Sequence, residues 1–153
     1  VYSCGAGANY GTALESALKM GETIHIPSCC YEIEEYIHGP NLQLTPQYNV
    51  IFFDGNDGAS RRVEQVYKAT RKVTNRAYLI SNNPQLSSDD HVLSLSDTVS
   101  SELSPLVYLP FVQLLSFIVS NDLHSIYQHP LLKEFKAIAA AKTENFVNYD
   151  GDD

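Results

Sequence analysis

The chain has 153 residues, of which 44% are hydrophobic and 18% charged, a composition that predicts one globular domain with a core of its own. Its formal net charge of -8, from 18 acidic and 10 basic residues, argues against a nucleic-acid surface, because binding to a nucleic-acid backbone requires clustered Lys and Arg. The charge is compatible with an anionic small molecule, since a few aimed backbone amides can hold a phosphate inside an acidic protein.

The chain contains three cysteines, Cys4, Cys29 and Cys30. The odd count and the adjacent pair argue against a disulfide framework, and no CxxC or His/Cys ligand spacing indicates a zinc site. We therefore expect reduced thiols, no metal and no cofactor, in a cytoplasmic protein without a visible signal peptide.

Strand-like and helix-like patterns alternate from the first residue onwards. The apolar run at 1–4 predicts a strand that is already under way, so we expect further residues upstream of Val1. Alanine and leucine recur at helical spacing over 10–22 and predict a helix, with Asn9 as a candidate N-terminal cap and Pro27 beyond its end.

A second, shorter helix is predicted over 30–38, where Gly39 and Pro40 end it. The continuous apolar run at 49–53 is typical of a strand that is buried on both faces of a sheet. The remaining predicted elements are a helix over 60–74, strands over 76–81 and 91–95, and helices over 106–123 and 131–141.

This order of elements predicts an α/β fold, a three-layer αβα sandwich around a mostly parallel sheet. We expect one domain over 1–145 and an acidic tail over 146–153. The most apolar stretch, 106–119, is too short to span a bilayer, and we expect a buried helix that helps to bury a domain or subunit interface.

The stretch G-A-G-A-N-Y-G at 5–11 follows a predicted strand and opens a predicted helix. A dinucleotide-binding G-x-G-x-x-G motif would need glycine in place of Tyr10, and no acidic residue ends the second strand about 20 residues further on. We interpret Gly5 and Gly7, with Asn9 and Tyr10, as a place where the chain approaches an anion or a sugar hydroxyl at the helix N-terminus. The alternative is a tight strand-to-helix turn without a ligand.

Charged residues form a stripe on the first predicted helix. Glu15, Lys19 and Glu22 are spaced i, i+4 and i+7 and therefore share one face. Glu35 and His38 lie one turn apart on the next helix. From spacing alone, solvent-facing pairs worth a few tenths of a kcal/mol are the favoured interpretation of both sets.

Two multi-residue patterns in these stretches resemble the sugar isomerase (SIS) domain family. N-Y-G-T-A-L-E-S-A-L-K-M-G-E at 9–22 is similar to the family signature A-L-E-x-A-L-K-x-x-E, and E-x-x-H-G-P follows at 35–40 with a similar gap. A Q-L-L triplet at 113–115 also matches. The chain most resembles the second, C-terminal SIS half of the isomerase part of glutamine–fructose-6-phosphate aminotransferases, together with related deglycases and deaminases of aminosugar phosphates.

The resemblance implies a flavodoxin-like topology and a role for each matching residue. Glu22 would be the base that moves a proton between C1 and C2 of an open-chain sugar phosphate, and Lys19 would tune its charge. His38 would help to open the sugar ring and would reach a site in the neighbouring subunit, with Glu35 orienting it. Lys142, in an Ala-Lys-Thr context, would correspond to a lysine near the end of the aminotransferases.

The chemistry of aldose–ketose interconversion suits these residue types. The reaction passes through an enediol, or an enolamine when nitrogen is at C2, and a carboxylate can take the proton from one carbon and return it to the next. Fixed donors can meet the developing oxyanion without a metal. Histidine titrates near neutrality, which suits a proton shuttle for ring opening.

The sequence also departs from the aminotransferase pattern. Ser28-Cys29-Cys30 stands where that pattern has Ala-Glu-Ala, which favours a deglycase-like or isomerase-like relative. The Ser-x-Ser-Gly-x-Thr phosphate loop of the first SIS half is not in this chain, nor is a glutaminase domain. We therefore expect the C-terminal half of a two-SIS protein, whose first SIS domain supplies the phosphate loop.

The leading functional hypothesis is an enzyme that isomerises, deaminates or deglycates a sugar-6-phosphate or aminosugar-6-phosphate. We expect a homo-oligomer that has no nucleic-acid or membrane partner. One alternative is a non-catalytic SIS module that senses phosphosugars, although such sensors usually keep the phosphate loop and can lack the Glu and His. The other is a structural domain whose motif residues only stabilise helices.

Overall fold

The structure, a computed structural model, describes residues 1–95, 99–125 and 138. The predicted acidic tail, Lys142 and the helix predicted over 131–141, apart from Ile138, lie outside the described residues.

A five-stranded parallel sheet forms the centre of the molecule. Its strands lie in the order β2-β1-β3-β4-β5, and every neighbouring pair is parallel. In the register, Ser3 of β1 lies opposite Cys30 of β2 and Ile51 of β3. The strands are β1 (Tyr2–Gly5), β2 (Cys29–Glu32), β3 (Val50–Asp54), β4 (Ala77–Ser81) and β5 (Val92–Ser94).

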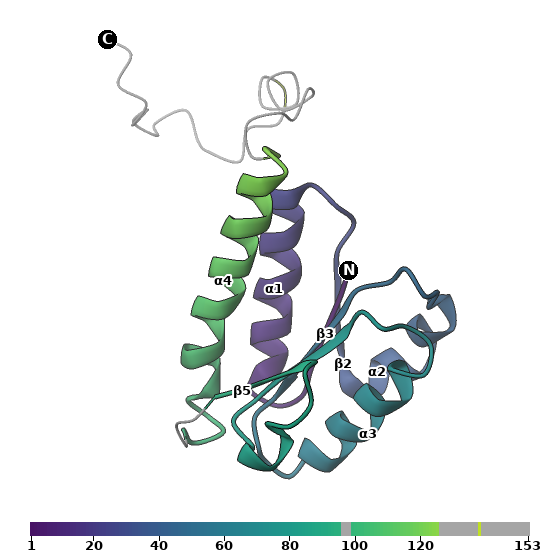
Figure 1. Ribbon diagram of the computed structural model, residues 1–153, viewed down its shortest axis with the longest axis vertical. Coiled ribbons are helices and arrows are strands. Elements are labelled where there is room, and N and C mark those ends of the chain that lie inside the picture. Colours follow the sequence, from purple (N-terminus) through teal and green to yellow (C-terminus); the bar gives the residue numbers. More distant parts are fainter. Residues whose placement is uncertain (96–98, 126–137, 139–153) are drawn as a thin grey trace.

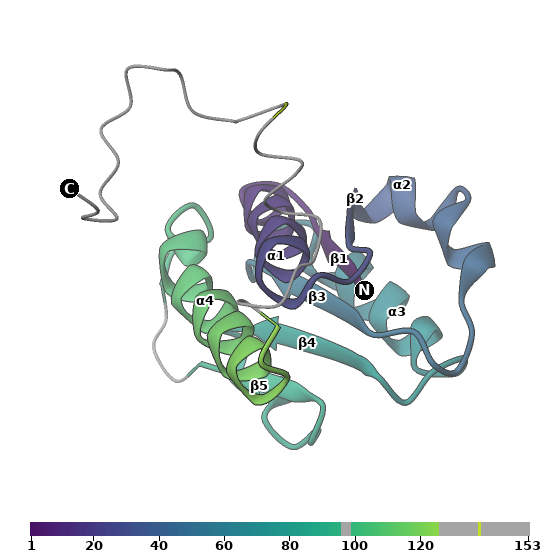
Figure 2. The same ribbon diagram turned by 90° about the horizontal axis from the view of Figure 1, so that it is seen from above.

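Helices cover both faces of this sheet. On one face lie α1 (Asn9–Ile24) and α4 (Ser104–Asp122), packed side by side. On the other face lie α2 (Ile33–Ile37) and α3 (Ser60–Thr70), as the view from above shows (Figures 1 and 2). Two short 3-10 helices, η1 (Pro40–Gln43) and η2 (Pro84–Leu86), complete the connections. The predicted three-layer αβα sandwich is confirmed.

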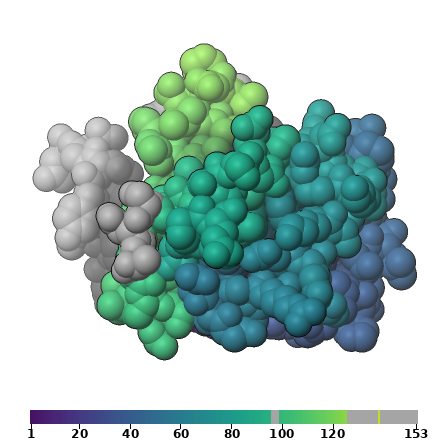
Figure 3. Space-filling model, turned by 60° about the horizontal axis from the view of Figure 1, so that its bottom comes forward, coloured from purple at the N-terminus to yellow at the C-terminus, as the bar shows by residue number. Residues whose placement is uncertain are grey.

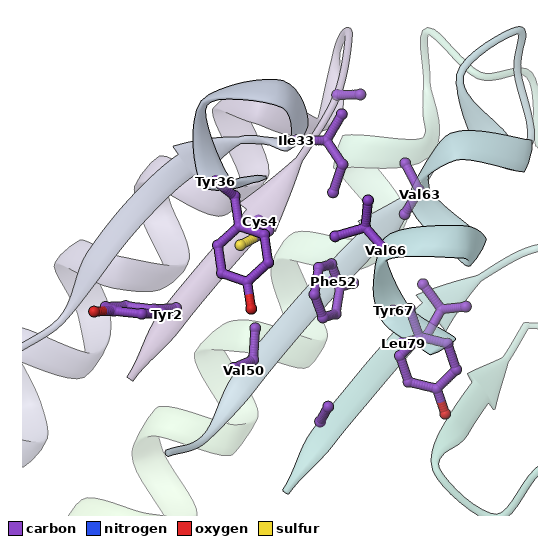
Figure 4. Close-up of a cluster of buried hydrophobic side chains, with 12 residues drawn as sticks. Tyr2, Cys4, Ile33, Tyr36, Val50, Phe52, Val63, Val66, Tyr67 and Leu79 are labelled. Atoms are coloured by element: carbon purple, nitrogen blue, oxygen red, sulfur yellow. The ribbon is translucent and has the colours of Figure 1, made fainter. Parts of the chain in front are cut away.

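Buried hydrophobic side chains form two clusters, one on each face of the sheet. Both clusters draw on the same strands, because successive side chains of a strand point to opposite faces. Phe52 of β3 joins Tyr36 of α2 and Tyr67 of α3 in one buried cluster (Figure 4). Phe53, one residue later, joins Val112 of α4 in the other cluster. The apolar run predicted to be buried on both faces is therefore confirmed, since all five residues of β3 are buried.

The second predicted helix is wrong over its first three residues, because Cys29–Glu32 form the edge strand β2 and only Ile33–Ile37 are helical. The Glu32 side chain accepts the backbone N–H of Glu34 at 2.7 Å and starts α2. Asn9 is likewise not a cap but the first residue of α1, where Ala8 holds the cap position without a side-chain hydrogen bond.

The prediction that the most apolar helix is buried is also wrong. α4 buries one stripe of side chains, and only 28% of its apolar window lies inside the protein. By length and composition alone α4 is the one helix among the described residues that could cross a membrane. Here it packs against α1: Ser116 Oγ lies 4.0 Å from Met20 Sδ, and Asn9 Nδ2 donates to Ser104 Oγ at 2.7 Å.

Candidate functional site

The carboxyl ends of β1 and β3 form the first candidate site. α1 follows β1 on one face of the sheet and α3 follows β3 on the other, so the chain turns away in opposite directions and leaves a crevice between the strand ends. Such switch points are the usual ligand sites of open parallel sheets. In the space-filling view from this side, the loops after β3 and β4 meet the start of α4 (Figure 3).

Gly5 and Gly7 are required by the shape of this turn. A Cβ on Gly5 would lie 2.3 Å from the backbone oxygen of Asn9, closer than any real contact. Gly7 has φ of 54°, in the left-handed region that favours glycine. A tight strand-to-helix turn therefore explains both glycines, and the same turn exposes the backbone of Gly7 at the crevice.

Asn9 lies beneath the crevice rather than in it. Its side chain is 1% exposed, its Nδ2 donates to Ser104 Oγ at 2.7 Å, and its Oδ1 accepts from Thr12 Oγ1 at 3.0 Å. The amide nitrogen therefore joins α1 to α4, and the amide oxygen accepts a hydrogen bond from within α1. Because the side chain is buried, Asn9 shapes the crevice from below and is not exposed to a ligand in it.

Asp57 stands at the mouth of the crevice, a position that the sequence analysis missed. Its Oδ1 accepts the backbone N–H of Ala59 at 2.8 Å, and its Oδ2 lies 3.3 Å from where a Cβ on Gly7 would be. Below it, buried Asp54 accepts from Ser60 Oγ and from Ser81 Oγ, the latter at 2.7 Å. A carboxylate at this mouth repels a phosphate, so the crevice of this lobe favours a neutral group such as a sugar hydroxyl. The Asp-Gly-Asn-Asp-Gly sequence, which begins with the last residue of β3, was the available signal.

Tyr10 and Glu35 are two predicted site residues that the fold brings together. They meet beside Cys30, the second residue of β2. The pKa of the Tyr10 phenol is raised, chiefly by the charge of Cys30 and to a smaller extent by Glu35. Burial raises the pKa of the Cys30 thiol, so this cysteine is not activated as a nucleophile.

The charged stripe lies on the outer side of α1 as the helical spacing predicts. Lys19 Nζ donates to Glu22 Oε2 at 2.8 Å and lies 3.5 Å from Glu15 Oε1. The hydrogen bond to Glu22 is the main reason that the pKa of Lys19 is raised. The side chains of Lys19 and Glu22 are 30% and 49% exposed, so an incoming molecule can reach the pair.

His38 lies at the C-terminal end of α2, where its backbone N–H donates to the carbonyl of Glu35 at 3.1 Å. The Glu35 carboxylate accepts the backbone N–H of Glu32 at 3.4 Å and completes a capping box. Glu34, next to it, binds Arg62 through two hydrogen bonds of 2.6 and 3.0 Å. The pKa of the Glu34 carboxyl is lowered mainly by these hydrogen bonds from Arg62, and the charge of nearby His38 lowers it further.

Within one chain, Glu22 and His38 lie on opposite sides of the sheet. Glu22 is near the end of α1, which runs back from the carboxyl edge for 16 residues, roughly 24 Å at 1.5 Å per residue. His38 ends α2, which packs on the other face with α3. Joint action of the two residues therefore requires another chain or lobe.

Neither Glu22 nor His38 lines either of two clefts in the described part of the chain. An apolar cleft of about 510 Å³ lies between α4 and β3–β5, with Ile51, Phe111 and Leu115 on its walls. A smaller cleft of about 330 Å³ separates α2 from α3. Among the described residues no three His, Cys, Asp or Glu side chains cluster as metal ligands would.

Comparison with known proteins places the chain in a family. The model of the SIS domain matches residues 1–103, and the chain belongs to the SIS domain family. A glutamine–fructose-6-phosphate aminotransferase (isomerizing) of Methanothermobacter thermautotrophicus is 32% identical over 122 residues, which are 77% of this chain and 20% of that protein. The chain thus spans about a fifth of the length of the curated relatives that it matches.

Solved structures share the fold. The C-terminal domain of glucosamine-fructose-6-phosphate aminotransferase from Francisella tularensis superposes with a TM-score of 0.67 at 23% identity, over 78% of this chain and 35% of that one. Tagatose-6-phosphate ketose/aldose isomerase from Escherichia coli superposes with a TM-score of 0.69 at 17% identity, over 80% of this chain and 36% of that one. The expected resemblance to the SIS family and to its aminotransferase branch is confirmed.

Proposed function

We propose that this SIS domain contributes the base and the ring-opening group to an enzyme that acts on a sugar-6-phosphate or aminosugar-6-phosphate. Glu22 would move a proton between C1 and C2, in an isomerisation or in the linked deamination or deglycation. The observation that carries the proposal is the reachable Lys19–Glu22 pair, which lies in the segment that matches the family signature.

The geometry of this pair suits a base. The protonated Lys19 ammonium binds Oε2 of Glu22, so Oε1 is the oxygen that would take the proton from carbon. The proton would pass to the adjacent carbon, and the negative charge that develops on the substrate oxygen would lie near the Lys19 ammonium. The pair fixes the carboxylate without burying it.

The phosphate would be held outside this lobe. The crevice at β1 and β3 carries the Asp57 carboxylate, and the chain lacks the family's phosphate loop. A first SIS domain, in the same protein or in another subunit, would therefore supply the phosphate contacts. The 20% share of the aminotransferase that this chain matches leaves room for such a domain.

A phosphosugar sensor is the alternative from another class. A sensor needs the phosphate grip and not the base, and this chain has the reverse set of residues, which favours the enzyme. Binding and turnover separate the two: thermal shift with fructose 6-phosphate, glucosamine 6-phosphate and a sugar-phosphate amino-acid adduct detects a binder. Turnover of any of the three compounds by the full-length protein would support the enzyme hypothesis. Binding of these compounds without turnover would identify a sensor and contradict the enzyme hypothesis.

Replacing His38 should separate ring opening from proton transfer. In His38→Ala we expect turnover of a cyclic substrate to fall by about 10²-fold or more, the usual contribution of a general acid or base. Turnover of an analogue that cannot close its ring should change much less. Steady-state rates on the two substrates give the comparison, and equal losses on both would show that His38 does not open the ring.

A further inference from the structure

The helix that carries His38 is too short to hold its shape alone. α2 has only the five residues Ile33–Ile37, whereas an isolated helix in water needs roughly 12–15 residues to be even marginally stable. α2 is therefore held in place by the elements that it packs against, namely β2, η1 and α3. The position of His38, at the C-terminal end of α2, depends on these contacts.

Buried contacts provide the first link between α2 and α3. The hydroxyl of Tyr36 lies 3.0 Å from Thr70 Oγ1, and both side chains are buried. Tyr36 and Ile33 also pack into the buried cluster that contains Val66 of α3 (Figure 4). These contacts account for the attachment of α2 to α3.

An ion pair at the surface provides the second link. Nε and Nη2 of Arg62 donate to Oε1 and Oε2 of Glu34 at 2.6 and 3.0 Å. The two side chains are 43% and 50% exposed, and exposed ion pairs add little to stability. The effect of this pair is therefore to be sought in what it does to its neighbours.

His38 is the charged neighbour of this pair on α2. Glu34 lies four residues before His38, a spacing at which side chains on a helix meet, and an acidic residue that precedes a cationic one in this way is in the favourable order. Glu34 and His38 would therefore form an intrahelical pair if Glu34 had no other partner. The guanidinium of Arg62 occupies both oxygens of the carboxylate instead, a stronger arrangement than a single hydrogen bond to an imidazole.

Glu35, which the family resemblance implies as the residue that orients His38, is engaged at the other end of α2. Its carboxylate accepts the backbone N–H of Glu32 at 3.4 Å, and its charge contributes to the raised pKa of Tyr10. Among the described residues, Glu34 is the carboxylate whose pKa responds to the charge of His38.

We propose that Arg62 is a positioning residue for His38: by binding both oxygens of Glu34, Arg62 keeps this carboxylate from drawing the imidazole back along α2. The ring is then available to a molecule outside the helix. The use that a substrate makes of the ring rests on the proposed function, whereas the competition between Arg62 and His38 for Glu34 does not.

NMR of isotopically labelled histidine tests the competition without turnover. The imidazole signals of His38 are identified by their loss in His38→Ala. We expect Arg62→Ala to shift these signals, because the ring then hydrogen-bonds to the released Glu34 carboxylate. Arg62→Ala combined with Glu34→Ala should return them most of the way to their wild-type positions, since the competing carboxylate is gone.

Lys68→Ala is the matched control, because it breaks another exposed ion pair of α3, the 3.2 Å contact with Glu64, and should leave the His38 signals unchanged. Circular dichroism should be unchanged in all these variants, since the buried contacts of α2 remain. His38 signals that do not move in Arg62→Ala, or that do not return in the double variant, would overturn the inference.

Turnover by the full-length protein gives the second readout. With a cyclic substrate, Arg62→Ala should lower turnover by about 10-fold, because the catalytic group is misplaced, and an analogue that cannot close its ring should be affected much less. Arg62→Ala with Glu34→Ala should recover most of the loss, a result that a merely structural ion pair would not give. No loss with the cyclic substrate, or no recovery in the double variant, would overturn the positioning role. If the imidazole signals respond as expected but the wild type turns over no phosphosugar, the proposed function fails and the competition for Glu34 stands.

Discussion

Gly5 and Gly11 lie six residues apart in the same motif, yet the structure gives them opposite tolerance to a side chain. A Cβ on Gly5 collides with the backbone of α1, whereas a Cβ on Gly11 meets nothing within 4 Å. We expect Gly5→Ala to lower the free energy of unfolding by about 3 kcal/mol, because backbone atoms cannot move aside cheaply. Gly11→Ala, its control, should raise it by about 0.5–1 kcal/mol through better helix propensity.

Urea titration of the two variants measures both changes. Equal stability of Gly5→Ala and wild type would show that the turn from β1 into α1 can accommodate a methyl group. The result also bears on function, since the same turn shapes the crevice at the carboxyl ends of β1 and β3.

At the residue scale, the sequence predicted pairs within one helix, but it did not predict contacts between segments that are far apart in the chain. The spacing of Lys19 and Glu22 fixed their pairing, since residues three apart on a helix are neighbours. The contacts of Asn9 with Ser104 and of Asp57 with the Gly7 turn join distant segments. No local spacing carries such information, so these two were missed.

Helix α2 has only five residues, and its start depends on two glutamates. Glu35 closes the capping box, so Glu35→Ala should lower the free energy of unfolding by about 0.5–1 kcal/mol. Glu35→Gln should keep the cap, since an amide oxygen can also accept the N–H of Glu32. Urea titration gives the two values.

Activity measurements then distinguish two roles of Glu35, the capping of α2 and the orientation of His38. If Glu35 acts only as a cap, Glu35→Gln should keep full turnover of a cyclic substrate. A large loss of turnover at unchanged stability would show that its charge acts on the imidazole.

At the element scale, the order and type of most elements could be predicted, because buried strands and amphipathic helices leave strong patterns. β2 is the exception. Its residues Cys29 and Cys30 precede a helical pattern, and their strand conformation comes from pairing with Tyr2 and Ser3 of β1, 27 residues away, which the local sequence does not show. α4 was predicted as a helix but not its exposure, because apolar composition alone does not distinguish a buried helix from one at an interface.

The whole molecule carries several buried tyrosines, which make its stability sensitive to alkali. Burial raises the pKa of Tyr36 to about 12 and also raises the pKa values of Tyr67 and Tyr108. The unfolded chain loses these protons near pH 10, before the folded protein does. Stability should therefore be complete below about pH 10 and fall as the pH rises toward about 12.

Urea titrations between about pH 8 and about pH 12 measure this decline. Tyr36→Phe is the control: it removes the 3.0 Å hydrogen bond to Thr70 at every pH and should reduce the slope above about pH 10. A slope that does not differ from wild type would show that Tyr36 ionises freely in the folded protein.

For the whole molecule, we propose that α1 delivers a carboxylate base to a phosphosugar held by another domain. Proton exchange between solvent and the C1 or C2 position of bound substrate, followed by NMR in deuterated water, reports that step alone. We expect Glu22→Gln to slow the exchange by about 10²- to 10⁴-fold while substrate binding is kept, because glutamine fills the same space without accepting the proton. Exchange at the wild-type rate in Glu22→Gln would contradict the account.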